Sequence, residues 1–93
     1  ALVETNALFE KDAVRPVAAG NLPDAVKELI MPHIENHERI LNAALTCDRE
    51  LVVQAFMNDP LVKGKGCKEE DTRKLVSDMI ANTAAYLPEG WKK

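Results

Sequence analysis

The chain has 93 residues, 46% hydrophobic and 29% charged, with a formal net charge of -3, which is the composition of one globular domain, or part of one, with a thin core. The acidic balance provides no basic stripe for nucleic acid, and the apolar stretches are far shorter than the ~20 residues that span a bilayer. Because the start also lacks a signal-peptide pattern, we expect a soluble, cytoplasmic protein without nucleic acid or membrane partners.

Residues 1–19 contain two short extended runs. The first, Leu2 to Leu8, interleaves apolar and polar side chains, and the second spans Val14 to Ala18. The polar break between them, at residues 10–12, is typical of a hairpin or of two adjacent strands. Pro16 cannot donate a backbone hydrogen bond, so the second strand should be an edge strand or be interrupted there. Two strands alone are marginal in water, and we expect the helices or further polypeptide to cover them.

A long helix is predicted from about residue 21. Asn21 is its expected N-cap, with Pro23 in the first turn. Apolar residues then recur at three- and four-residue steps over about six turns, and Leu41 lies at the centre of this predicted buried stripe. Pro32 lies inside the pattern, and because the stripe resumes in phase we expect a kink rather than a break.

Two further helices are predicted after the long one. Asp48 is the expected N-cap of the first, which Asp59-Pro60 ends, and the second runs from about Glu69 to near Pro88. Residues 63–68 between them are expected to form a flexible turn, and the short links favour antiparallel neighbours. The sequence therefore predicts a mainly α (α+β) fold, in which a strand pair in residues 1–19 precedes three helices in residues 20–93.

Candidate metal, phosphate and redox groups are few. His33 and His37 lie four residues apart, a spacing that can hold zinc or nickel, but no third ligand is evident and we predict a packed or interface pair. Residues 63–66, Lys-Gly-Lys-Gly, lack the ending and the preceding strand of a phosphate loop, so we expect a solvated helix connection. Cys47 and Cys67 should be reduced thiols, since no export signal is present.

Polar residues interrupt the first strand at Glu4, Thr5 and Asn6. In open α/β sheets, polar side chains at strand ends often face the ligand crevice, although a solvent-facing strand side accounts for them equally well. Trp91 is equally compatible with packing on lysine stems and with binding sugar. Since no carboxylate pair has a catalytic spacing, we assign no catalytic, cofactor-binding or metal-binding residue to this chain.

Six segments, in order along nearly the whole chain, carry a family resemblance. They are Val3-Glu4-Thr5-Asn6, Arg15-Pro16-Val17, Gly20-Asn21-Leu22-Pro23, Ala43-Ala44-Leu45-Thr46, Ala55-Phe56-Met57-Asn58-Asp59-Pro60-Leu61 and Tyr86-Leu87-Pro88. Together they resemble the C-terminal part of glycoside hydrolase family 4, closest to its α-galacturonidase-like and α-galactosidase-like members. The chain also begins without Met, as a piece of a longer polypeptide would, so we expect residues 1–93 to be a C-terminal fragment of a substrate domain.

The resemblance implies a fold like that of the lactate and malate dehydrogenases. It also implies NAD and a divalent metal such as manganese as cofactors. Family 4 enzymes cleave α-glycosides or uronides by oxidation at C3, proton abstraction at C2 and elimination. The family's glycine loop, its Cys and His metal ligands and its catalytic tyrosine belong to upstream segments. The resemblance therefore implies that the isolated chain binds no cofactor and is inactive.

Three residues are the candidates for the substrate crevice. By resemblance, Glu4 and Asn6 match the strand that edges the substrate domain, and the guanidinium of Arg15 could pair with the carboxylate of an acidic sugar. The expected partners are the upstream part of the same polypeptide, the carbohydrate substrate of the whole enzyme, and further copies in a homo-oligomer. An alternative hypothesis is a stand-alone helical interaction module without catalytic activity, whose exposed apolar face recruits a partner.

Overall fold

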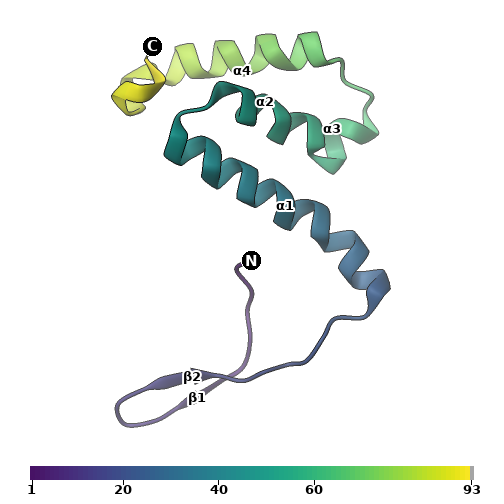
Figure 1. The fold of residues 1–93 in the computed structure, drawn as a ribbon, viewed down its shortest axis with the longest axis vertical. Helices are drawn as coiled ribbons and strands as arrows, with labels where there is room; N and C mark the ends of the chain where they lie inside the picture. The colour runs from purple at the N-terminus through teal and green to yellow at the C-terminus, as the bar shows by residue number, and fades with distance from the viewer. Residues whose placement is uncertain (93) are drawn as a thin grey trace.

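The computed structural model describes residues 1–92 as a short antiparallel hairpin followed by a layer of helices (Figure 1). The mainly helical class predicted from the sequence is thereby confirmed. A short fourth α-helix joins the three expected ones, starting at the predicted helix end at Asp59-Pro60 and running into the turn predicted over residues 63–68. In chain order the elements are β1 (Ala7–Phe9), β2 (Val14–Pro16), α1 (Asp24–Thr46), α2 (Arg49–Asn58), α3 (Pro60–Gly64), α4 (Glu69–Thr83) and the 3-10 turns Ala84–Tyr86 and Glu89–Trp91.

The hairpin projects away from the helices (Figure 1). Its register pairs Ala7 with Pro16 and Phe9 with Val14, so the first strand begins later than the expected Leu2. The proline ends the second strand, as its missing N–H predicts. Because a two-stranded sheet is marginal by itself, the exposed apolar side chains of this hairpin need a cover that residues 1–92 do not provide.

The long helix α1 begins three residues later than its predicted cap. Pro23, not Asn21, occupies the N-cap position, and its carbonyl accepts hydrogen bonds from Val26 N and Lys27 N at 3.0 and 2.9 Å. The helix runs through Pro32 without a break, as predicted. It ends at Thr46, and the C-cap residue Cys47 adopts the left-handed conformation with φ 55°, an uncommon state for a residue other than glycine.

The buried face of α1 differs from the predicted stripe. Its buried residues are Asn36 and Ala43, whereas Leu41 is 52% exposed and His37 is exposed. The placement of Leu41 at the centre of the buried face was therefore wrong. Helix α2 packs on the side of α1 that carries the small side chain of Ala43, because a small residue lets two helices approach closely. Several larger apolar side chains of α1 stay half exposed or more, among them Leu29, Leu41 and Leu45.

The core lies where α1, α2, α4 and the C-terminal turn meet. Asp48 caps α2 as predicted, since its carboxylate accepts hydrogen bonds from Glu50 N at 2.8 Å and Leu51 N at 3.3 Å. Trp91 returns from the C-terminus into the cluster, where Arg49 Nη2 donates to its carbonyl at 2.9 Å. The buried apolar members of the cluster are Ala43, Val53, Val76, Ile80 and Trp91.

Gly90 lets the C-terminal turn that carries Trp91 pass close to Cys47. A Cβ atom at Gly90 would lie 2.6 Å from Cys47 Sγ, so we expect Gly90→Ala to lower the free energy of unfolding by about 1 to 3 kcal/mol through overpacking. Gly64→Ala is the matched control, because position 64 is helical with no neighbour within 4 Å, and we expect it to stabilise by about 0.5 to 1 kcal/mol. Urea unfolding of both variants measures the difference. Equal midpoints would contradict this close contact.

Candidate functional site

A depression lies at the open end of the hairpin, beyond the last strand pair. It has a volume of about 510 Å³ and is lined by Glu4, Thr5 and Asn6 on one side and by residues 17–19 on the other. Thr5 Oγ1 donates to the carbonyl of Val17 at 2.7 Å, and Val17 N donates to the carbonyl of Asn6 at 2.8 Å. These two hydrogen bonds hold the two chain segments together and place Glu4 and Asn6 around one polar depression.

Arg15, the third candidate from the sequence, does not line this depression. It lies opposite Leu8 in the hairpin, and its Nε donates to Glu10 Oε2 at 3.1 Å. Both side chains of this ion pair are well exposed. The structure therefore brings two of the three candidate residues together and gives the third a carboxylate partner of its own.

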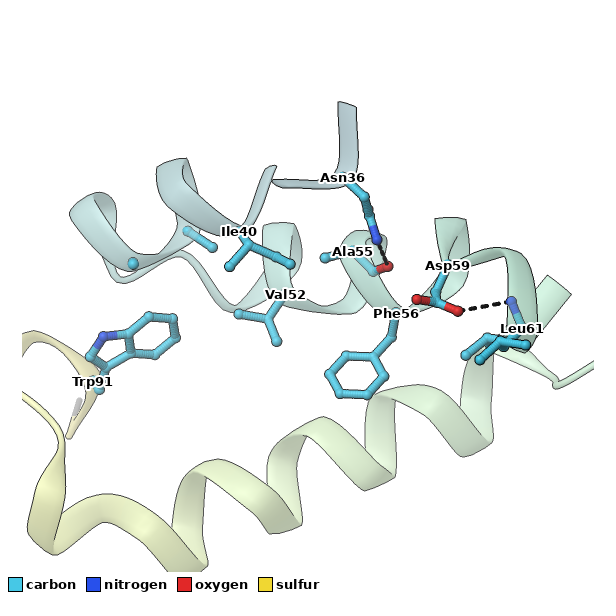
Figure 2. Close-up of a pocket in the computed structure, with 11 residues that line it drawn as sticks. Asn36, Ile40, Val52, Ala55, Phe56, Asp59, Leu61 and Trp91 are labelled. Atoms are coloured by element: carbon cyan, nitrogen blue, oxygen red, sulfur yellow. Dashed lines mark hydrogen bonds between the residues drawn. The ribbon is translucent and has the colours of Figure 1, made fainter. Parts of the chain in front are cut away.

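A second concavity, which we call the helical groove, was not anticipated from the sequence (Figure 2). It has a volume of about 580 Å³ and lies between α1, α2, α3 and the C-terminal turn. Helices α1 and α2 were predicted and α3 was not, and the groove depends on how these helices pack, which no local pattern records. Its main apolar side chains are Ile40, Val52, Phe56, Leu61 and Trp91.

The polar side chains of the helical groove already have partners. Asn36 is buried, and its Nδ2 donates to the carbonyl of Ala55 at 2.8 Å, while its Oδ1 accepts from Arg39 Nη1 at 3.4 Å. Asp59 Oδ1 accepts a hydrogen bond from Leu61 N at 2.8 Å, which caps α3 (Figure 2). These groups join α1 to α2 and start α3.

The other candidates from the sequence stay apart from both concavities. His33 and His37 are exposed on α1, and within residues 1–92 no group of three or more His, Cys, Asp and Glu side chains is placed to hold a metal ion. Gly64 ends α3 and Gly66 forms the following turn with φ 63°. Cys47 and Cys67 are free, as expected. None of the described helices combines the length and the apolar content needed to cross a bilayer.

An ion pair on the surface, between Arg73 and Glu50, links α4 to α2. Arg73 donates to both carboxylate oxygens of Glu50, at 2.6 and 2.7 Å, and to Glu69 Oε1 at 2.6 Å. The hydrogen bonds from Arg73 lower the pKa of the Glu50 carboxyl, and those to Glu50 and Glu69 raise the pKa of the guanidinium. Similarly, the hydrogen bond to Asp78 raises the pKa of Lys74. All of these groups are solvated, so they position helices rather than create a reactive centre.

The family profile and the similar proteins point to the same family. The profile of the family 4 glycosyl hydrolase C-terminal domain matches residues 1–62. The α-galacturonidase of Lachnoclostridium phytofermentans is 58% identical over 91 residues, which are 98% of this chain and 19% of that protein. No solved structure matches the chain significantly.

More distant relatives carry related names. The α-galacturonidase of Bacillus subtilis is 42% identical over 86% of this chain and 17% of its own length. The α-galactosidase of Rhizobium meliloti is 28% identical over 96% of this chain and 18% of its own length. The chain thus spans about a fifth of the length of the relatives that it matches.

Proposed function

The chain belongs to glycosyl hydrolase family 4, of which it carries the C-terminal domain, and from this membership we propose that it is part of a cytoplasmic α-galacturonidase. In this proposal the whole enzyme hydrolyses the O-glycosidic bond of α-galacturonides, and residues 1–93 supply a helical scaffold and one wall of the substrate crevice. The observation that carries the proposal is the 58% identity to an α-galacturonidase over 98% of the chain.

Glu4 and Asn6 are the residues of this chain that we propose to contact the sugar. The carboxylate of Glu4 can accept a hydrogen bond from a hydroxyl, and the amide of Asn6 can both donate and accept. Thr5 is already bonded to Val17 across the depression, so its role is to position its neighbours. We do not assign the sugar carboxylate to Arg15, because its Nε is paired with Glu10.

We also propose that the enzyme works with NAD and a divalent metal, as its family implies. The described residues of this chain do not fit either group. Its closely spaced glycines, Gly64 and Gly66, lie at the end of a helix and in the turn after it, not after a strand, whereas a dinucleotide site places its glycines between a strand and a helix. His33 and His37 have no third ligand among residues 1–92. We therefore place both cofactor sites in the rest of the polypeptide and derive no reaction step from this chain.

The test is made on the full-length enzyme with nitrophenyl glycosides. We expect kcat/KM for the α-galacturonide to exceed that for the α-galactoside by at least about 100-fold, since a site built to bind a polar group rejects a substrate lacking it. We expect Asn6→Ala to lower kcat/KM by about 10- to 100-fold, the range for one lost hydrogen bond to the bound sugar. Asn82→Ala, the same change at an exposed position of α4, should leave it unchanged.

Two results would contradict the proposal. A preference for the galactoside would reject the substrate assignment while leaving the family membership intact. Equal activity of Asn6→Ala and Asn82→Ala would show that the polar depression lies outside the substrate crevice. The alternative of a helical interaction module without catalytic activity would require that the full-length protein cleave neither substrate.

A further inference from the structure

The described chain exposes far more surface than a self-contained domain of its size. Its accessible area is 7764 Å², about 2,400 Å² more than the roughly 5,400 Å² expected for a folded monomer of this size. The Cα radius of gyration is 17.9 Å, against about 12 Å for a compact domain of similar length. Much of the apolar surface that would normally form a core therefore faces outward.

The helical groove is a well-defined part of this uncovered surface. Leu61 at its rim is 78% exposed and Ile40 is 52% exposed. Ligand pockets orient their ligands with a few free polar groups, but the Asn36 amide and the Asp59 carboxylate are already hydrogen-bonded to the protein. A groove lined this way is suited to apolar side chains from another polypeptide segment, which need no directional partner.

We propose that the helical groove receives an apolar face, most simply that of an amphipathic helix, from the larger part of the same polypeptide that precedes this domain. The matched relatives are about five times longer than the chain, and the matched family domain is their C-terminal one. A standard interface with a second copy covers roughly 800 Å² per partner, about a third of the excess. A tethered segment also binds at high effective concentration.

Thiol labelling of the full-length protein tests this occupant. Cysteine is introduced at the groove in Leu61→Cys and, separately, in Ile40→Cys. The control is Lys74→Cys, because the Lys74 side chain is 77% exposed on α4 outside the groove. Each variant is treated with a maleimide, and modification of the peptide carrying the new cysteine is followed by mass spectrometry at protein concentrations from nanomolar to tens of micromolar.

We expect the groove cysteines to react at least about 100-fold more slowly than Cys at position 74, because labelling then requires the covering segment to open. The protection should not depend on protein concentration. Equal rates at the groove and control positions would overturn the proposal, and protection that disappears on dilution would overturn it in favour of a second copy. The labelling rate does not depend on enzyme activity, so the proposal for the helical groove can be rejected while the proposed substrate is retained.

Discussion

Trp91→Ala is expected to lower the free energy of unfolding by about 3 to 5 kcal/mol, the range for removing a large buried aromatic side chain. Trp91 is only 8% exposed and packs in the core with Val53, Val76 and Ile80. Few other buried side chains exist to fill the cavity, because this core is thin. A loss of this size is a large part of the ~5 to 15 kcal/mol available to a typical domain.

Chemical denaturation of the full-length enzyme and of residues 1–93 measures the loss. Leu41→Ala is the control, since its side chain is 52% exposed, and in residues 1–93 we expect it to cost less than about 1 kcal/mol, as for most exposed positions. If Leu41→Ala cost as much as Trp91→Ala in residues 1–93, the buried face of α1 would be the apolar stripe after all. A small effect of Trp91→Ala in both proteins would contradict the C-terminal turn as part of the core.

Local signals in the sequence predicted where the helices lie better than they predicted which face of each helix is buried. Asp48 was identified correctly as a cap because a carboxylate two and three residues before free backbone N–H groups is a purely local feature. The start of α1 was misplaced because both Asn21 and Pro23 favour a helix N-terminus, and only the structure shows that the helix begins after Pro23.

The buried face of α1 could not be identified from apolar periodicity alone. The stripe containing Leu41 is genuine in the sequence, but which face packs on α2 depends on a close approach at Ala43 and on the buried hydrogen bond from Asn36 to Ala55. A polar residue inside a helix contact is not recognised by a search for apolar spacing. The exposed stripe is consistent with a cover that lies outside residues 1–93.

The candidate site was predictable only where polar residues departed from a local pattern. Glu4 and Asn6 were recognised because they interrupt a strand-like run, and the structure places them around one depression. The helical groove gave no such signal, since Ile40, Phe56 and Trp91 are ordinary apolar residues on separate elements. Their convergence follows from the turn at Cys47 and from the return of the C-terminus past Gly90.

The isolated chain of residues 1–93 is expected to show no saturable NAD binding and no glycoside turnover, while the full-length enzyme shows both. Dinucleotides bind where a glycine-rich turn lets the pyrophosphate reach a helix N-terminus. In this chain the only glycines within two residues of each other are Gly64 and Gly66, at the end of α3 and in the following turn. The proposed contribution of Glu4 and Asn6 is to bind the sugar, which does not by itself supply a hydride acceptor.

Calorimetric titration of both proteins with NAD and manganese, followed by assays on nitrophenyl α-galacturonide, measures the difference. The full-length enzyme provides the positive control for each ligand, and circular dichroism of residues 1–93 checks that its helices are formed. Micromolar NAD binding by the isolated chain, or turnover that a chelator abolishes, would contradict the division of labour proposed here. The C-terminal domain would then hold cofactor-binding groups beyond the substrate wall and the helical groove, and the search for them would begin at the exposed faces of α1 and α4.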